Sequence, residues 1–291
     1  MEIRLLKYFL AVAREGSISG AAEALHITQP TLSRQLKDLE NELDTTLFIR
    51  GNRNITLTDD GLLLRKRAEE IIMLVDKTEQ EFLHDDIVSG DLHIGGGETD
   101  GMRLIAGIIK KLQSKYPHVK VHLFSGNADD ISEKLDKGIL DFCIFIGSVD
   151  IKKYDYLQLP LKDKWGLLMR KDSPLSSHDI ITPNDLWDLP LLVSRQAINS
   201  NEFSGWMGSD FEKLNIVATY NLIYNASLMV EEGVGYALCI DKLVNTTETS
   251  NLCFKPLSPN MESNLYIAWK KHQTFSTSGM KFLKMVQEEL L

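Results

Sequence analysis

Short polar and cationic side chains follow one another between residues 29 and 37, and their chemistry suits the reading of a DNA base sequence. An arginine can donate two hydrogen bonds to guanine in the major groove, while Lys, Ser, Thr and Gln bond to phosphates or base edges. Two further arginines flank a Gly-Asn tip near residue 52. The residues that we predict to contact DNA are Gln29, Pro30, Thr31, Ser33, Arg34, Lys37, Arg50 and Arg53.

The apolar residues around this segment predict the elements that position it. Four leucines recur in steps of four, three and four from Leu32 to Leu43, which predicts one buried face of a helix opposite the polar residues. Thr28 is expected to cap that helix, and Pro30 is tolerated in its first turn. A short helix over residues 17–25 would precede it, separated by a four-residue break. The spacing is that of a helix-turn-helix.

Two flanking segments extend this unit. Residues 3–14 form a further amphipathic helix, and residues 47–57 contain two short β-prone runs around the Gly-Asn tip. Three helices followed by a two-stranded wing make a winged helix-turn-helix, which we assign to residues 1–58. Taken alone, the leucine-rich helix could be an ordinary surface helix with a solvated polar face, and only its neighbours favour a DNA-binding unit.

The residues just described also resemble a known family. The segments AAEALHITQPTLSRQLKDLENEL and TTLFIRGNRNITLTDDG are similar to the N-terminal signature of the LysR-type bacterial transcriptional regulators, over residues 6–61. The resemblance implies a DNA-binding regulator that forms homodimers or homotetramers. It implies as partners a two-fold-related site in double-stranded DNA, a small-molecule effector and RNA polymerase. His26 stands in the turn, where helix-turn-helix units often have glycine.

The charge balance does not single out a nucleic-acid-binding protein. The net charge is −9, and residues 1–90 hold 11 Lys and Arg against 16 Asp and Glu. Residues 1–67 are nearly balanced, with 10 cations and 9 anions. Discrimination between DNA sites should therefore depend on shape and on a few base contacts more than on a strong general attraction to phosphate.

A long helix is predicted after the wing. Apolar positions from Leu64 through Ala68, Ile71 and Val75 to Phe82 alternate in steps of four and three, with Thr78 between the last two. This period of 3.5 is typical of a coiled coil, so we expect these positions to form a dimer seam. In the resembled family this segment, residues 59–88 here, is the linker helix that pairs two DNA-binding heads. The alternative is a helix that lies on its own domain.

Residues 89–291 alternate short β-rich runs with amphipathic helices, which predicts an α/β fold with a mostly parallel sheet. SGDLHIG, LDKGILDFCIF and VEEGVGYALCIDKLV resemble the effector-binding region of the same family. That region consists of two Rossmann-like α/β subdomains similar to periplasmic binding proteins. We place the first subdomain at about 89–161 and 269–291 and the second at about 162–268, with chain crossings near Leu161 and Trp269.

The resemblance places the effector between the two subdomains, at loops that follow strands and precede helices. The glycine run 95–97 matches no phosphate-loop spacing and is expected to be a flexible turn lining this cleft. Glu98 and Asp100 would favour a cationic or neutral effector and Arg195 an anionic one, so the charge of the effector stays open. The residues expected to bind the effector are Thr99, Ser125, Asn127, Ser194, Arg195 and Asn225.

Other chemistries are poorly represented. Cys143, Cys239 and Cys253 match no zinc pattern and lie in apolar runs, although a thiol-switch regulator of the same fold is conceivable. There is no nucleophile motif, so an enzyme is not expected, and no cofactor or metal is expected either. The chain begins without a signal peptide and has no apolar run of membrane-spanning length, which predicts a cytoplasmic protein without membrane contact and argues against a solute-binding protein.

Overall fold

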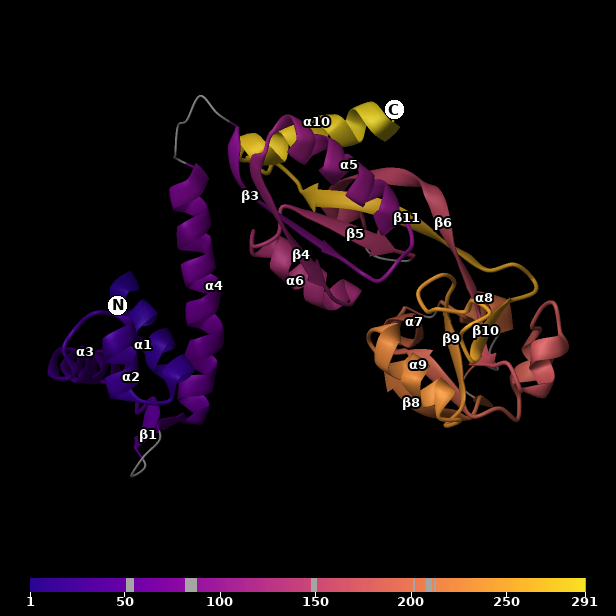
Figure 1. The fold of residues 1–291 in the computed structure, drawn as a ribbon, viewed down its shortest axis with the longest axis horizontal. Coiled ribbons are helices and arrows are strands. Elements are labelled where there is room, and N and C mark those ends of the chain that lie inside the picture. Colours follow the sequence, from indigo (N-terminus) through magenta and orange to yellow (C-terminus); the bar gives the residue numbers. More distant parts are fainter. Residues whose placement is uncertain are drawn as a thin grey trace. The chain divides into compact units, whose positions relative to one another are not determined.

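The computed structural model describes residues 1–50, 55–81, 88–147, 151–200, 202–207, 211 and 213–290. The chain divides into two compact units, Met1–His84 and Asp85–Leu291. Each unit has its own hydrophobic cores and is described by itself (Figure 1).

The first unit is the predicted winged helix-turn-helix followed by a long helix. Its strands β1 and β2 form an antiparallel pair in which Phe48 lies opposite Leu57. The elements are α1 (Ile3–Glu15), α2 (Ile18–Ala24), α3 (Gln29–Glu42), β1 (Phe48–Arg50), β2 (Ile55–Leu57) and α4 (Asp59–Glu81). This confirms the three helices and the wing that the spacing of apolar residues predicts.

The leucine face of α3 forms the centre of the core of this unit. Leu32, Leu36 and Leu39 are buried against α1 and α2, as predicted. Leu43 is different, because it lies beyond the last turn of α3 and is 38% exposed. The chain leaves the helix direction at the next residue, Asp44, whose φ is 50°. The buried face of α3 therefore ends at Leu39 and does not include Leu43, the last leucine of the predicted series.

The turn between α2 and α3 has a backbone geometry that the sequence does not predict. His26 adopts the left-handed conformation with φ of 54°, which is uncommon for a residue other than glycine. Thr28 occupies the N-cap position of α3, but its side chain makes no capping hydrogen bond to the backbone. Its hydroxyl instead lies 2.8 Å from the hydroxyl of Thr31. The expected threonine cap is thus wrong in its chemistry, although the helix begins where predicted.

Helix α4 packs along its own unit over its first half. Ala68 is completely buried in the core that α1, α2 and α3 share, and Leu64 and Ile71 pack against the same core. The Lys7 ammonium of α1 also lies 3.4 Å from the Asp76 carboxylate of α4. Ala68 is therefore not available to a dimer seam, whereas Leu64 and Ile71 are only partly covered by their own unit. The reason is that the apolar core of this unit covers the first half of α4 at Ala68.

The second unit is built from strands that alternate with helices, as predicted. Its strands are β3 (Ser89–Gly96), β4 (His118–Ser125), β5 (Phe142–Ile146), β6 (Tyr154–Arg170), β7 (Leu191–Ser194), β8 (Ile216–Tyr220), β9 (Tyr236–Ile240), β10 (Leu252–Pro256) and β11 (Glu262–Lys270). Its helices are α5 (Met102–Lys115), α6 (Ala128–Asp136), α7 (Arg195–Asn199), α8 (Ser204–Met207), α9 (Ile223–Glu231) and α10 (Thr277–Leu290). Short 3-10 turns lie at Ile151–Lys153, Pro174–Ser177 and Pro183–Leu186.

The strands are ordered β4-β3-β5-β11-β6-β9-β7-β8, and β10 pairs with β6. Pairs of β3 with β4 and β5, and of β7 with β8 and β9, are parallel. All pairs that involve β6 or β11 are antiparallel. The expectation of a mostly parallel sheet thus holds within each subdomain and fails at the two strands that join them, because these strands run in opposite directions.

Strands β6 and β11 are shared by two subdomains with separate cores. We call β3–β5, α5, α6 and α10 the first subdomain and β7–β10 and α7–α9 the second. Strand β6 pairs with β11 along most of its length and with β9 only from Trp165 onward, and Figure 1 shows it continuing from one subdomain into the other. Strand β11 already pairs with β5 at Leu265, four residues before Trp269, and Trp269 packs against the core of the first subdomain. The return crossing therefore precedes the expected position.

Among the helices that the structure describes, none combines the length and the apolar character that crossing a membrane requires. Within the same residues, no group of three or more His, Cys, Asp or Glu side chains is placed to hold a metal ion.

Candidate functional sites in the helix-turn-helix unit and the two-subdomain unit

The polar face of α3 is presented to solvent. Gln29, Pro30, Thr31, Arg34 and Lys37 are exposed, and Ser33 is half-buried. Within the described part of the chain, the side chains of Arg34 and Lys37 make no hydrogen bond or ion pair, so neither is occupied by a neighbouring carboxylate such as Asp38. These two cations are free to bind an external acceptor.

The wing is held against the helices by backbone contacts. The Glu40 carboxylate of α3 accepts hydrogen bonds from the N–H groups of Leu47, at 2.7 Å, and Phe48, at 3.3 Å. The N–H of Ile55 donates to the carbonyl of Gly16 at the end of α1, at 2.8 Å. Glu40 is therefore turned toward the wing and away from the polar face of α3. Arg50 is the last residue of β1, and Arg53 lies outside the described residues.

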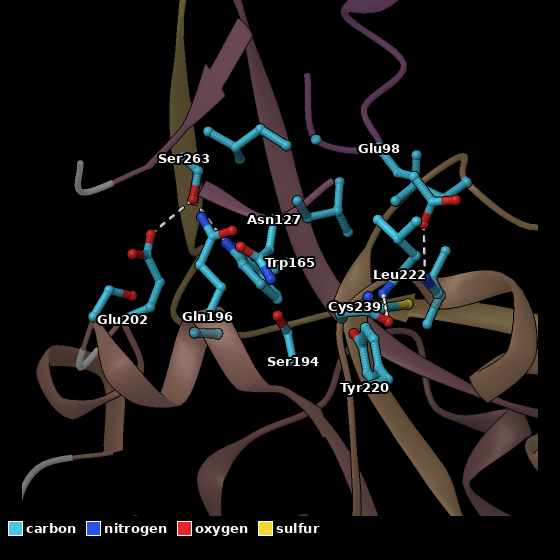
Figure 2. A pocket seen from close by; sticks show the side chains of 18 of the residues that line it. Glu98, Asn127, Trp165, Ser194, Gln196, Glu202, Tyr220, Leu222, Cys239 and Ser263 are labelled. Carbon is cyan, nitrogen blue, oxygen red and sulfur yellow. Dashed lines mark hydrogen bonds between the residues drawn. The ribbon is translucent and has the colours of Figure 1, made fainter. Parts of the chain in front are cut away.

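The second unit contains a pocket between its two subdomains (Figure 2). The pocket is open to solvent, and its empty space amounts to about 580 Å³ when the open solvent is included. The first subdomain contributes the loops after β3 and β4, and the second contributes the ends of β7, β8 and β9 with the helices that follow β7 and β8. Carboxyl ends of parallel strands from both sides thus converge here, where ligands bind in open α/β sheets.

The glycine run at residues 95–97 packs more closely than expected. Gly95 and Gly96 belong to β3 and are buried, and a Cβ at Gly95 would lie 2.5 Å from Leu140 Cδ1. A Cβ at Gly97 would lie 2.8 Å from Ile146 Cδ1. The expected flexible turn is therefore wrong for Gly95 and Gly96, which belong to β3. A Cβ at Gly95 would force the Leu140 side chain to move. Gly97 lines the pocket.

Two side chains fill the N-terminus of α6 at the pocket. The Asn127 side chain accepts a hydrogen bond from the N–H of Asp130 at 2.9 Å and so caps the helix. The Gln196 side-chain oxygen, from the second subdomain, accepts a hydrogen bond from the N–H of Ala128 at 2.9 Å. The first-turn N–H groups of α6 that could bind an anion are therefore partly taken by the protein, and one of these bonds joins the two subdomains.

At the N-terminus of α9, which belongs to the second subdomain, the acceptor comes from the first subdomain. Glu98, from the loop after β3 in the first subdomain, accepts a hydrogen bond from the N–H of Ile223 at 2.7 Å through Oε2. A carboxylate at this position is favoured by the unpaired N–H groups and by the dipole of the helix. Each subdomain thus supplies an acceptor to a helix N-terminus of the other, and Figure 2 shows Glu98 beside Leu222 at this end of the pocket.

A chain of hydrogen bonds lies at the other end of the pocket. The indole N–H of Trp165 donates to Ser263 Oγ at 2.8 Å, and the Ser263 hydroxyl donates to Glu202 Oε1 at 2.8 Å. Gly147 has a φ of 70°, and a Cβ there would lie 2.9 Å from Glu202 Oε1, so its lack of a side chain makes room for the carboxylate. Figure 2 shows Glu202 and Glu98 on opposite sides of Trp165.

The charges around the pocket have one sign. Among the described residues that line it, Glu98 and Glu202 carry charge and no Lys, Arg or His is present. The remaining polar groups are amides and hydroxyls, including Ser194 and Tyr220. The Tyr220 hydroxyl donates to the carbonyl of Leu238 at 2.6 Å, and burial of the phenol raises the pKa of Tyr220 well above its usual value.

Of the six residues expected to bind an effector, two line this pocket, namely Asn127 and Ser194. Ser125, Arg195 and Asn225 are exposed and are not part of the pocket lining. In particular, Arg195 begins α7 with its side chain in solvent, so the anionic effector that it suggested has no cation in the pocket.

Thr99 is also outside the lining, because it is buried just behind the loop. Its hydroxyl accepts a hydrogen bond from the N–H of Gly101 at 2.9 Å, and Thr99 is only 7% exposed. It neighbours Asp163, a carboxylate on the crossing strand β6 that is 5% exposed. Burial raises the pKa of Asp163 to about 6, partly offset by a hydrogen bond from Thr99, and Asp163 Oδ2 has no partner in the described part of the protein.

Trp165, Gln196, Glu202 and Ser263 are among the pocket residues that the sequence does not predict. They lie on β6, α7, the segment after α7, and β11, and none belongs to a recognisable motif. Gln196 follows Ser194 and Arg195 directly, and in this loop Ser194 and Gln196 line the pocket whereas Arg195 does not. Trp165 and Ser263 are brought to the pocket only by the crossing strands.

The three cysteines are poor candidates for a thiol switch. Cys143 and Cys239 are buried, and burial raises the pKa of each thiol far above its usual value. Cys253 is half-buried and its pKa is raised for the same reason. Reactive cysteines have lowered pKa values and access to solvent, which favours core packing for all three.

Known proteins match both units. Residues 3–62 match the family described as "Bacterial regulatory helix-turn-helix protein, lysR family", and residues 86–291 match "LysR substrate binding domain". The chain therefore belongs to the LysR family of transcriptional regulators, which have a DNA-binding helix-turn-helix and an effector-binding domain.

The chain is similar to known regulators over most of its length and to a solved full-length structure in its fold. The Hca operon transcriptional activator HcaR of Escherichia coli is 29% identical, over 100% of this chain and 98% of that protein. A protein named "Probable RuBisCO transcriptional regulator" from Porphyra purpurea is 31% identical, over 81% of this chain and 76% of that one. The crystal structure of full-length CbnR in complex with its target DNA is 20% identical and covers 99% of both chains, with a TM-score of 0.76.

Proposed function

We propose that this protein binds double-stranded DNA through α3 and the wing, and that a small molecule in the pocket between the two subdomains switches its effect on transcription. The observation that carries the proposal is the pocket itself, which is lined from both subdomains and bridged by hydrogen bonds of Glu98 and Gln196. A ligand that changes these bridges changes how the subdomains are held together. A pair of states that a ligand biases is what a switch requires.

For the DNA-binding unit, the proposal assigns base contacts to Gln29, Pro30, Thr31, Ser33 and Arg34. It assigns phosphate contacts to Lys37 and to the wing residues Arg50 and Arg53. Exposed side chains along one face of α3 and the unoccupied Arg34 and Lys37 support this assignment. We propose that two chains bind a two-fold-related site, since paired heads gain affinity from their effective concentration, and that the bound protein contacts RNA polymerase.

The test combines a ligand screen with an operator-binding assay on the full-length protein. A small molecule that raises the melting temperature should also change operator affinity or DNA bending. Ser194→Tyr places a large side chain in the pocket and should abolish both responses while leaving operator binding without ligand intact. Arg195→Tyr, at the neighbouring exposed position, is the matched control and should respond as the wild type does. A ligand response that survives Ser194→Tyr would place the effector elsewhere.

A further inference from the structure

We infer that the pocket binds a small organic cation, an amine or a guanidine, with its charged groups held by Glu98 and Glu202. This inference rests on the proposed function and adds the chemical class of the effector. Among the described residues that line the pocket these two side chains alone carry charge, and both are carboxylates. They lie on opposite sides of Trp165 (Figure 2), so a linear molecule between them meets a carboxylate at either end.

Each carboxylate keeps one oxygen for a ligand. Glu98 uses Oε2 for the N–H of Ile223, and Glu202 uses Oε1 for the hydroxyl of Ser263. No hydrogen bond to Glu98 Oε1 or Glu202 Oε2 is present in the part of the chain that the structure describes. The existing bonds fix the orientation of both side chains, and a preformed acceptor loses little conformational freedom when a ligand binds.

The same contacts disfavour an anion. A ligand carboxylate would normally bind at the helix N-termini, but Glu98 occupies that of α9, and Asn127 and Gln196 occupy that of α6. An anion would therefore have to displace these groups and would still lie beside two like charges. The indole of Trp165, which is held by its hydrogen bond to Ser263, adds an aromatic surface of the kind that cations prefer.

The test uses probes of one length and three charges: 1,4-diaminobutane, butane-1,4-diol and succinate, with agmatine as a guanidine. Binding to the full-length protein is measured by calorimetry and by melting temperature at constant ionic strength. We expect a saturable response to 1,4-diaminobutane or agmatine and none to succinate. Glu98→Gln and Glu202→Gln keep an acceptor oxygen and remove the charge, and each should weaken amine binding about tenfold, the usual value of one charge-assisted hydrogen bond.

A matched control separates the pocket from a general attraction of cations to an acidic protein. Glu232→Gln makes the same change of net charge at an exposed position beyond the far end of α9 and should leave amine binding unchanged. Equal loss in Glu232→Gln, or no amine response at all, would overturn the inference. A response to succinate that Ser194→Tyr abolishes would also overturn it, yet would leave the proposed function standing. Loss of operator binding in every condition would instead contradict the proposed function.

Discussion

Glu98 Oε2 and the backbone N of Ile223 lie 2.7 Å apart, although the two residues are 125 positions apart in the chain. The bond joins the loop after β3 in one subdomain to the first turn of α9 in the other. It gives α9 a cap that its own N-cap residue, Leu222, cannot supply, because leucine has no side-chain acceptor. A single carboxylate therefore both completes a helix and links the two walls of the pocket.

The first prediction concerns this link. Glu98→Ala should lower the free energy of unfolding by about 1 kcal/mol, the usual cost of losing a helix cap. Amide hydrogen exchange at Ile223 should increase about fivefold, because its N–H loses its only acceptor in the described structure. Exchange measured by mass spectrometry on peptides covering the start of α9 checks this, with Glu232→Ala as the control. Unchanged exchange in Glu98→Ala would show that the bond does not hold the helix end.

The second prediction separates base reading from anchoring on DNA. Arg34→Ala should lower affinity for the operator far more than for random DNA, by about 1–3 kcal/mol of discrimination, because its guanidinium is exposed and unpaired in the described structure. Arg53→Ala should weaken binding to both DNAs similarly and lower the salt slope by about one unit per head. Gel-shift titrations at several salt concentrations distinguish the two. An unchanged ratio of specific to random affinity in Arg34→Ala would remove it as a base reader.

The third prediction concerns the two faces of α4. Ala68 is completely buried, so Ala68→Asp should destabilise the first unit by on the order of 3 kcal/mol, as an unpaired buried charge does. Met73 is 39% exposed, so Met73→Lys should change stability by no more than about 0.5 kcal/mol. If α4 pairs two chains through its exposed side, Met73→Lys should also shift the protein toward monomers in sedimentation experiments. A Met73→Lys protein that remains fully associated would argue against pairing through this face.

The fourth prediction is a pH dependence from Asp163, whose pKa is raised to about 6 by burial on β6. Between about pH 4 and 6 the Asp163 carboxyl is protonated in the folded state and ionised in the unfolded chain. The free energy of unfolding therefore falls as the pH rises through this window. The total effect is about 3 kcal/mol for a shift of about two pKa units. The variant Asp163→Asn has no titrating group at this position and should lack this pH dependence. The difference in unfolding free energy between variant and wild type should grow from pH 4 to 6 and stay constant above pH 7, as measured by urea unfolding; a constant difference throughout would contradict the raised pKa.

The fifth prediction concerns the thiols. Cys143 and Cys239 should not react with N-ethylmaleimide in the native protein at neutral pH, and Cys253 should react slowly, because burial raises the pKa of all three thiols. All three should react once the protein is unfolded in urea. Treatment with hydrogen peroxide should leave operator affinity unchanged. Rapid labelling of one cysteine together with a peroxide-dependent change in DNA binding would restore the thiol-switch alternative.

The sequence by itself determined the local elements and the family. The leucine spacing of α3 and the order of helices and wing were predictable, because periodicity follows directly from which side of an element is buried. The same holds for the alternating strands and helices of the second unit. The motif also identified the exposed face of α3, since polar residues opposite a buried stripe have nowhere else to lie.

Only the tertiary structure decided which polar residues share a pocket. Trp165 and Ser263 reach it because β6 and β11 cross between the subdomains, and Glu98 meets Ile223 because strand ends from both subdomains converge. The sequence likewise could not predict which face of α4 packs on α1, since an apolar period of 3.5 residues fits packing against either a partner chain or the same chain. The spacing of apolar residues indicates which side of a helix or strand is buried. What covers that side depends on contacts between residues far apart in the sequence.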